Sequence, residues 1–223
     1  MKLTVNDLYD LTHTQAADYL RGFTYPWEAL AGIGDMILAE VAALHSDEYE
    51  HTSENVWIAR DAKVYPTATI IGPCIIGPGT EVRPGAFIRG NAMVGANCVV
   101  GNSTELKNVI LFDNVQVPHY NYVGDSILGY KAHMGAGSLT SNVKSDKLPV
   151  VIHNQGEELP TGRKKVGALI GDRVEVGCNT VLNPGTVIGR DSNIYPLSSV
   201  RGVIPAECIY KQGGNIVPKQ FDF

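Results

Sequence analysis

Residues 58–106 read IARDAKVYPTATIIGPCIIGPGTEVRPGAFIRGNAMVGANCVVGNSTEL, and this stretch decides the fold. An aliphatic residue stands at every sixth position: Ile58, Val64, Ile70, Ile76, Val82, Ile88, Val94, Val100 and Leu106. A small residue follows four positions after each of the first eight: Ala62, Ala68, Cys74, Thr80, Ala86, Ala92, Cys98 and Thr104. Neither the 3.6-residue period of a helix nor the two-residue period of a strand produces this spacing. A six-residue repeat instead indicates a β-helix.

The repeat predicts a triangular prism in which each hexad forms one short strand and one turn. Three hexads complete a coil, the aliphatic residue fills the interior, and the small residue fits the crowded corner. This combination is typical of the left-handed parallel β-helix, an exception to the right-handed crossover rule. We therefore predict a mainly β fold, a hexapeptide-repeat solenoid over residues 51–212. Each coil stacks only on its neighbours, so the ends need caps.

Residues 1–50 differ from the repeat and predict a short α-helical segment. Apolar residues with helical spacing follow Pro26, a residue suited to an early helical position: Leu30, Ile33, Ile37, Leu38, Val41 and Leu44. A shorter helix is expected over residues 14–21. The segment is too small to fold alone, so we expect it to pack on the prism or on a neighbouring chain, and it is a candidate cap. Residues 213–223 are expected to form a loosely ordered C-terminal tail.

Two interruptions break the repeat. The register slips between Leu106 and Tyr122 and resumes with Tyr122, Leu128 and Met134. A polar loop over residues 143–166 follows, and the repeat then returns from Ile170 to Val200. Such a long loop in a compact solenoid is usually functional or an oligomer contact. Because residues in a break need not obey the packing of the repeat, we expect the chemistry there.

Three features near the interruptions are candidates for the chemistry of a site. His119 lies in the first break, where a neutral imidazole can accept a proton from an amine; a surface histidine is the alternative. Gly135-Ala136-Gly137 offers backbone amides that can stabilise an oxyanion, or it is a plain turn. Asn142 stands where the long loop begins, a place where asparagine also commonly serves a turn.

Charged residues on the coils before the break suggest an anion site. Arg83 and Lys107 are both expected to point outward and could together hold a phosphate, although solvated surface charge is the alternative. His119, His133 and His153 lack the spacing of a zinc site, so no metal is expected.

Bulk composition narrows the class of protein. A net charge of −5 without blocks of like charge argues against general binding to nucleic acid or membrane surfaces. Cys74 and Cys98 fall on inward positions, which favours buried thiols in a reducing cytosol over disulfides. No signal peptide and no apolar run of membrane-spanning length are visible, so a cytoplasmic protein is expected.

Motifs around the breaks resemble a known family. The segments VPHYNYVGDSILG (117–129), MGAGSLTSN (134–142) and GRKKVGALIGDRVEVGCNTVLNPG (162–185) are similar to the C-terminal half of bifunctional sugar-1-phosphate nucleotidylyltransferase/N-acetyltransferases, which belong to the hexapeptide-repeat acyltransferases. The likeness runs through residues 24–212. The Gly-rich LxGGxGTR-type loop of the family's nucleotidylyltransferase half does not occur in this sequence. The resemblance therefore implies a chain without uridylyltransferase activity.

The resemblance implies an acetyl-CoA-dependent N-acetyltransferase acting on an amino-sugar phosphate of the glucosamine-1-phosphate or galactosamine-1-phosphate type. His119 takes the position of the catalytic base, and Asn142 matches a neighbouring site position. The implied positions for the sugar and its phosphate are Arg83, Lys107, Tyr122, His133, Lys144 and Lys147, where either of the last two lysines can serve and His133 replaces a family Asn. The implied acetyl-CoA positions are Ala136, Gly137, Cys178 and Lys211.

Family members are trimers with sites between subunits, so the resemblance also implies a homotrimer. Two other classes remain open. One is a non-catalytic trimer that binds a sugar phosphate or nucleotide sugar and partners a separate nucleotidylyltransferase. The other is a zinc enzyme like the γ-carbonic anhydrases, which the dispersed histidines disfavour.

Overall fold

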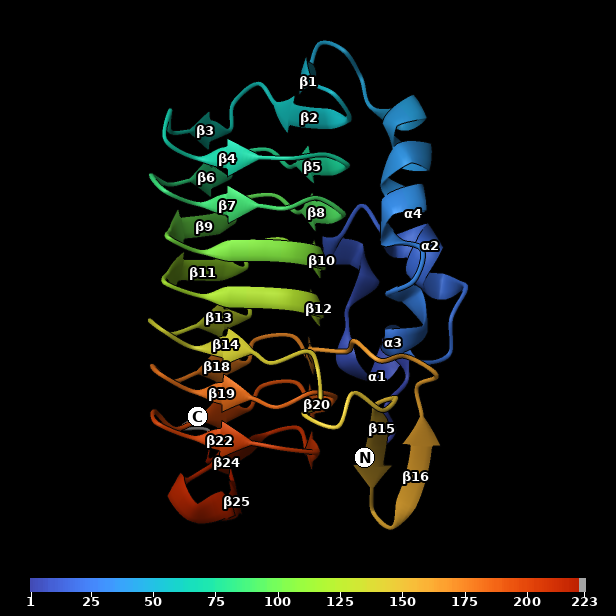
Figure 1. Ribbon diagram of the computed structural model, residues 1–223, viewed down its shortest axis with the longest axis vertical. Helices are drawn as coiled ribbons and strands as arrows, with labels where there is room; N and C mark the ends of the chain where they lie inside the picture. The colour runs from blue at the N-terminus through green and yellow to red at the C-terminus, as the bar shows by residue number, and fades with distance from the viewer. Residues whose placement is uncertain (221–223) are drawn as a thin grey trace.

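The computed structural model describes residues 1–220 and shows a left-handed parallel β-helix with a helical unit packed along one side (Figure 1). A nine-stranded sheet forms the first face of the prism, and a fourteen-stranded sheet wraps over the second and third faces. The prediction of a mainly β hexapeptide-repeat solenoid is confirmed.

The first face runs in chain order along the prism. Its strands are β3 (Lys63–Val64), β6 (Glu81–Val82), β9 (Val99–Asn102), β11 (Gln116–His119), β13 (His133–Met134), β18 (Glu175–Val176), β21 (Asn193–Ile194), β24 (Cys208–Tyr210) and the antiparallel β25 (Ile216–Pro218). The expectation of a loosely ordered tail is therefore wrong for β25, while residues 221–223 lie outside the described part of the chain.

The second and third faces share one sheet. The second face contains β4 (Thr69–Ile70), β7 (Phe87–Ile88), β14 (Leu139–Thr140), β19 (Val181–Leu182) and β22 (Ser199–Val200). The third contains β2 (Val56–Ala59), β5 (Cys74–Ile76), β8 (Ala92–Val94), β17 (Ala168–Ile170), β20 (Thr186–Ile188) and β23 (Val203–Ile204). Two strands run over both faces, β10 (Glu105–Leu111) and β12 (Tyr122–Leu128), and β1 (Tyr49–Ser53) pairs antiparallel with β2 at the N-terminal end.

The interior is built as the hexads predict. Val82 pairs with Val100 and Ile88 with Leu106 in successive coils, and all four side chains are fully buried. The small residues also point inward and bind the next coil. The Thr80 hydroxyl donates to the Gly95 carbonyl at 2.7 Å and accepts from the Cys98 amide at 2.9 Å. A repeat with threonine at the small position therefore contributes one apolar contact and one polar bridge between coils, whereas a repeat with alanine contributes only the apolar contact.

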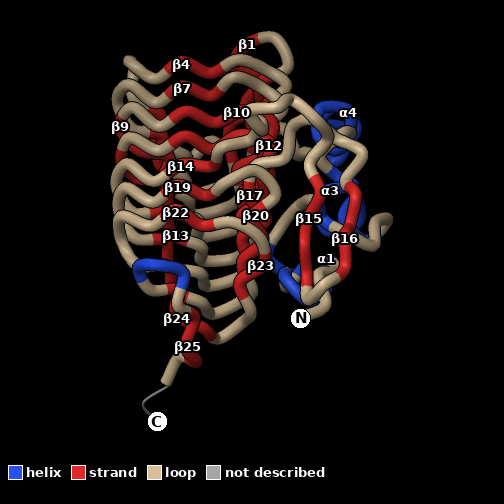
Figure 2. The backbone as a smooth tube through the Cα atoms, turned by 60° about the horizontal axis from the view of Figure 1, so that its bottom comes forward, coloured by secondary structure: helices blue, strands red, loops and turns tan. Residues whose placement is uncertain are grey.

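The outward side chains of the third face explain where the helices pack. They are apolar in nearly every coil: Trp57, Ile75, Met93, Ile110, Ile127, Leu169, Val187 and Val203. Those from Ile75 to Val187 are buried. Figure 2 shows the helices of residues 1–43 together with the hairpin of β15 (Val151–Asn154) and β16 (Glu157–Pro160) on this side of the prism. An apolar outer face needs a cover, because exposing it to water is unfavourable.

The N-terminal unit, residues 1–43, supplies most of this cover. It contains α1 (Val5–Leu8), η1 (Leu11–His13), α2 (Ala17–Arg21), α3 (Pro26–Ala29), α4 (Ile33–Glu40) and η2 (Val41–Ala43). Pro26 opens α3 as predicted, but the single expected helix is split into α3 and α4. The unit packs on the prism, as expected, but it lies along a side and does not cap the end.

Every irregularity of the repeat falls at one corner, the turn between the second and third faces. We call it the Asp125 corner, residues 107–108, 124–125 and 141–142. Partners in adjacent coils are 18 residues apart up to Leu106, and from there to the long loop they are 17 residues apart, as in Leu106 with Val123. The missing residue lets β10 and β12 run around the corner as continuous strands. Val123 therefore fills the inward position, and Tyr122 faces outward, which corrects the predicted register.

The long loop also leaves and returns at this corner. It folds into an antiparallel hairpin of β15 (Val151–Asn154) and β16 (Glu157–Pro160). Its two ends are joined, because the Val166 amide donates to the Asn142 carbonyl at 3.0 Å and the Gly167 amide donates to the Asp125 carbonyl at 2.8 Å. Among residues 1–220, no helix is long and apolar enough to cross a membrane.

Candidate functional site

His119 ends β11 at the turn between the first and second faces, which we call the His119 corner (residues 119–121, 136–138 and 178–180). Its side chain is exposed. Its carbonyl accepts the Gly137 amide at 3.0 Å, so Ala136 and Gly137 lie directly beside it in the next coil. The structure therefore brings the predicted base and the Gly-Ala-Gly turn together.

Asn121 supports this arrangement, and sequence reasoning missed it. Its side-chain oxygen accepts the His119 amide at 3.1 Å, and its buried side-chain amide donates to the carbonyls of Gly135 and Ser138 at 2.9 and 3.0 Å. A polar side chain buried by a repeat needs such partners. The signal in the sequence is an Asn at a position where the repeat places small residues.

The predicted acetyl-CoA positions continue along the same corner. The Asn179 amide donates to the Ala136 carbonyl at 2.8 Å, which places the exposed Cys178 one coil beyond Ala136. A Cβ at position 135 would lie 2.7 Å from the Cys178 nitrogen, so only glycine allows the two turns to stack this closely. Lys211 follows β24 at the same edge of the first face, two coils further along.

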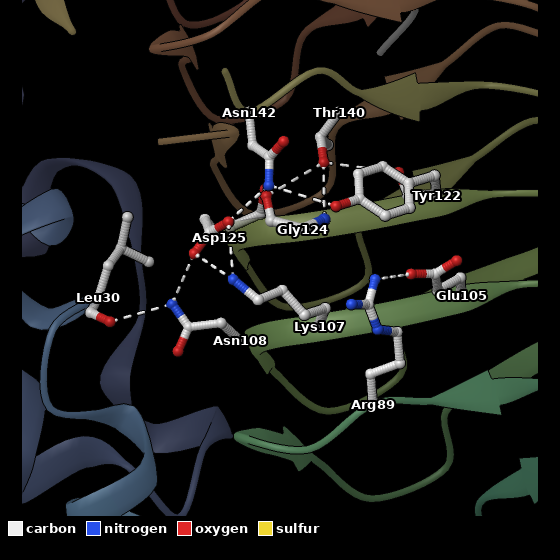
Figure 3. Close-up of polar contacts among 11 residues, drawn as sticks. Leu30, Arg89, Glu105, Lys107, Asn108, Tyr122, Gly124, Asp125, Thr140 and Asn142 are labelled. Carbon is white, nitrogen blue, oxygen red and sulfur yellow. Dashed lines mark hydrogen bonds and ion pairs between the residues drawn. The ribbon is translucent and has the colours of Figure 1, made fainter. Parts of the chain in front are cut away.

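Three predicted site residues meet at the Asp125 corner (Figure 3): Lys107 and Tyr122, predicted to bind the substrate, and Asn142, predicted beside the catalytic base. Lys107 Nζ lies 3.2 and 3.3 Å from the two carboxylate oxygens of Asp125. The Asn142 amide donates to Asp125 Oδ2 at 2.5 Å and to the Tyr122 hydroxyl at 3.2 Å. Lys107, Tyr122 and Asn142 thus surround one carboxylate, that of Asp125, which sequence reasoning did not single out.

Burial shapes the chemistry of this cluster. Asp125 is 2% exposed, so its carboxylate depends on the donors around it. Burial raises the pKa of Tyr122, and the Asp125 carboxylate raises it further, which keeps the phenol protonated at neutral pH. Glycine at position 124 leaves room for the Tyr122 hydroxyl to lie over the backbone, because a Cβ there would lie 2.5 Å from this hydroxyl.

The predicted pairing of Arg83 with Lys107 does not occur. Arg83 follows β6 on the first face, where its Nε binds Glu81 at 3.1 Å. The arginine one coil before Lys107 is Arg89, which binds Glu105 at 2.6 Å on the second face. The signal was available in the sequence, because Arg89 precedes Lys107 by one full 18-residue coil.

The lysines predicted after Asn142 lie elsewhere. Lys144 pairs with Asp146 at 3.1 Å, and Lys147 is exposed. An open pocket of about 490 Å³ lies at the Asp125 corner. Four cationic residues line it: Lys107, Arg163, Lys164 and Lys165. The rest of its lining consists of Leu30, Ala31, Asn91, Asn108, Asp125 and Gly162. The long loop therefore does place cations at this corner, but they come from residues 163–165, at its C-terminal end, and not from Lys144 or Lys147.

His133 and His153 are separated from both corners. His133 lies on the first face with Nδ1 2.7 Å from the Glu175 carboxylate, and His153 lies in the hairpin near Glu158. Within residues 1–220 no group of three or more His, Cys, Asp or Glu side chains is placed to hold a metal ion.

Comparison with known proteins gives consistent matches. The chain is 34% identical over 206 residues to the bifunctional protein GlmU of Methanococcus maripaludis strain S2, covering 91% of this chain and 50% of that protein. It is 37% identical over 94 residues to a bifunctional sugar-1-phosphate nucleotidylyltransferase/acetyltransferase of Sulfurisphaera tokodaii, covering 42% of this chain and 22% of that protein. The chain thus spans half or less of these curated relatives, and the predicted resemblance to such bifunctional proteins is confirmed.

Solved structures and a family model complete the comparison. A putative acetyltransferase from Bacillus cereus matches with a TM-score of 0.42 and 18% identity, over 74% of this chain and 77% of that chain. The model of the GMPPB C-terminal domain matches residues 70–188, which are 119 of the 223 residues. This span contains both corners and more than half of the sequence. The chain therefore belongs to the family of the GMPPB C-terminal domain.

Proposed function

We propose that this chain is an acetyl-CoA-dependent N-acetyltransferase whose acceptor is an amino-sugar phosphate of the glucosamine-1-phosphate or galactosamine-1-phosphate type. The observation that carries the proposal is the contact of His119 with the Gly135-Ala136-Gly137 turn through the hydrogen bond from the Gly137 amide. A proton acceptor and a side-chain-poor turn meet there on the exposed edge of the second face. The names of the bifunctional relatives support the same activity.

The reaction assigns each group a defined step. His119 accepts a proton from the sugar ammonium or amine as the nitrogen attacks the thioester carbonyl and the C–N bond forms. The tetrahedral oxyanion then collapses, the C–S bond breaks, and coenzyme A leaves as a thiolate that takes up a proton. A base in this role typically contributes ~10²–10⁴-fold to the rate.

The backbone of the turn supplies one hydrogen-bond donor to the acyl group. The Gly135 amide already donates to the Val176 carbonyl, and the Gly137 amide donates to the His119 carbonyl. In the described part of the chain this leaves the N–H of Ala136, the middle residue of the turn. We assign Ala136 to the thioester oxygen, because a fixed amide aimed at developing charge lowers the barrier.

The acceptor phosphate is assigned to the cations of the second face and the Asp125 corner. Arg89 and Lys107 lie one coil apart, and Arg163, Lys164 and Lys165 line the same pocket as Lys107. Cationic side chains form strong charge-assisted hydrogen bonds with phosphate oxygens. Tyr122 and Asn142 then contact the sugar between the phosphate and His119.

We also propose a homotrimer in which neighbouring chains complete the sites. Two large hydrophobic side chains are exposed along this edge of the prism: Tyr120, at 66%, lies in the His119 corner, and Leu197, at 69%, lies one coil beyond Cys178. Exposed apolar patches of this kind mark surfaces that bind another protein. Analytical ultracentrifugation tests this point, and a monomer at micromolar concentration contradicts it.

The activity is tested by loss of thioester absorbance with acetyl-CoA and a panel of amines: glucosamine-1-phosphate, galactosamine-1-phosphate and the unphosphorylated sugars. We expect turnover with a phosphorylated amino sugar and a drop of ~10²–10⁴-fold in His119→Asn. Equal rates for both proteins remove His119 from the role of base. No turnover with any amine favours a non-catalytic trimer that binds a sugar phosphate. A parallel arm with UTP tests the proposal that this chain does not transfer uridylyl groups.

A further inference from the structure

Asn108 connects the N-terminal unit to the Asp125 corner. Its side-chain amide donates to the Leu30 carbonyl at 3.0 Å and to Asp125 Oδ1 at 3.0 Å (Figure 3). A side-chain amide has two N–H donors, so these contacts use both. Leu30 follows α3, where a carbonyl has no partner within its own helix, and Asn108 provides one. The two bonds join residues 78 and 17 positions apart in the sequence.

The Asp125 carboxylate links Asn108 to the side chains that we assign to acceptor binding, Lys107 and Asn142. Its Oδ1 receives both Asn108 and Lys107, and its Oδ2 receives Lys107 and Asn142. A carboxylate held by several donors has one preferred orientation, and each donor is oriented in return. Loss of the Asn108 contact therefore frees the carboxylate that positions Lys107 and Asn142.

The N-terminal unit also forms a wall of the basic pocket. Leu30 and Ala31 line it together with Lys107 and Asp125. The N-terminal unit packs closely against the prism here, because a Cβ at Gly34 would lie 2.6 Å from the side-chain oxygen of Asn91, which lies one coil before Asn108. This wall of the pocket is thus held by the hydrogen bond from Asn108 to the Leu30 carbonyl and by the close packing of the Gly34 backbone against Asn91.

We propose that the N-terminal unit is part of the acceptor site, and that Asn108 is the positioning residue through which the Leu30 carbonyl sets the orientation of Asp125, Lys107 and Asn142. This inference rests on the proposed function for its kinetic consequences, but the coupling itself is a property of the chain. It assigns the first 43 residues a role in acceptor binding besides covering the third face.

The test variant is Asn108→Gly. Asn108 has a φ of +56°, a conformation that glycine adopts without strain, so the substitution deletes the amide and spares the backbone. Asn114→Gly is the matched control. It has a φ of +62° at a different corner, and its side chain makes no hydrogen bond in the described structure. Both variants add one glycine to a left-handed turn, and only the first removes the connection.

The kinetic readout separates positioning from general destabilisation. We expect the KM for the amino-sugar phosphate to rise about tenfold in Asn108→Gly, as for a lost hydrogen bond to a charged group, with the KM for acetyl-CoA unchanged. Asn114→Gly should leave both KM values at wild-type levels. A purely structural role for Asn108 would instead lower the amount of active protein while preserving both KM values, and that result overturns the proposal.

Hydrogen–deuterium exchange decides the coupling even if the chain acetylates no sugar. In Asn108→Gly we expect faster exchange both in residues 26–40 and in residues 140–146, with residues 186–200 unchanged. Asn114→Gly should leave the first two segments unaltered. Faster exchange confined to one of these two segments shows that they are not coupled through Asn108, whereas absence of turnover in the wild-type protein contradicts only the proposed function.

Discussion

The side-chain amide of Asn142 donates to the carboxylate of Asp125, and this single bond fixes which way the amide faces. A carboxylate only accepts hydrogen bonds, so the NH₂ group of Asn142 must point toward Asp125 and its oxygen must point away. The same NH₂ group also donates to the Tyr122 hydroxyl. Asn142 therefore presents an acceptor, and not a donor, to a ligand on the second face.

Replacing Asn142 with Asp turns this bond into a contact between two carboxylates. Because each disfavours ionisation of the other, the pKa of the new carboxyl is raised in the folded protein. The stability of Asn142→Asp should be nearest wild type in acid and should fall as the pH rises past that pKa, by about 1–3 kcal/mol at neutral pH. Urea unfolding at pH 4.5 and pH 7.5 checks the sign, with the larger loss of stability expected at pH 7.5. Asn183→Asp, on the same edge of the second face but without Asp125 as a neighbour, is the control, and an equal pH dependence in both contradicts the assignment.

Substitution of Arg89 and of Arg83 should affect phosphate binding differently. Arg89→Gln should raise the KM for the amino-sugar phosphate about tenfold or more, because a charge-assisted contact is lost on the second face. Arg83→Gln should leave this KM at the wild-type value, since Arg83 lies with Glu81 on the first face. Steady-state kinetics of the two variants at fixed acetyl-CoA is the measurement. A larger effect from Arg83 would restore the pairing suggested by the sequence motif.

Gly101 is the glycine most closely packed between coils. A Cβ there would lie 1.6 Å from the Pro118 carbonyl oxygen of the next coil. This oxygen belongs to the backbone, so it cannot move aside as a flexible side chain could. Gly101→Ala should therefore destabilise the protein by about 3 kcal/mol or more, at the upper end of overpacking costs. Gly162→Ala is the comparison, since nothing lies within 4 Å of its Cβ, and only the left-handed conformation costs about 1–2 kcal/mol. Chemical unfolding of both variants ranks them, and equal losses would show that adjacent coils can separate freely.

The four cysteines should differ strongly in reactivity. Burial raises the pKa of the Cys98 thiol to about 12 and raises that of Cys74 as well, so neither forms much thiolate at neutral pH. Cys178 is exposed and should react first with an aromatic disulfide reagent, and Cys178→Ser should abolish this fast phase. Stopped-flow labelling in native buffer and in denaturant gives the comparison. Rapid labelling of Cys98 in native buffer would mean that the prism opens readily.

The sequence predicts the prism well because its hexads encode burial directly. Val82, Ile88 and Val100 are inside at the positions that the six-residue spacing requires. The place of the N-terminal unit was harder to predict, because the signal for it lies in outward residues such as Ile75 and Met93, whose apolar character is noticed only once the faces are known.

The candidate site was predictable where it follows the register and not where the register changes. His119 and Gly137 keep their relation because the first two faces have regular strands. The sequence motif points to Arg83, whereas the 18-residue spacing of one coil before Lys107 points to Arg89. Asp125 and Asn108 could not be assigned from the spacing alone, since the missing residue that brings them into contact is visible only as a slip of one position.

The joined ends of the long loop make it exchangeable. The chain leaves the prism after Asn142 and re-enters at Val166, and the hydrogen bonds to the Asn142 and Asp125 carbonyls hold departure and re-entry side by side. Strands before and after the loop take their register from the neighbouring coils and not from its length. A chimera that carries another loop between these two residues should therefore keep the register of the coils on both sides and change the cations at the Asp125 corner. Because Val150 and Ile152 are buried, the new loop must also supply apolar side chains at their positions.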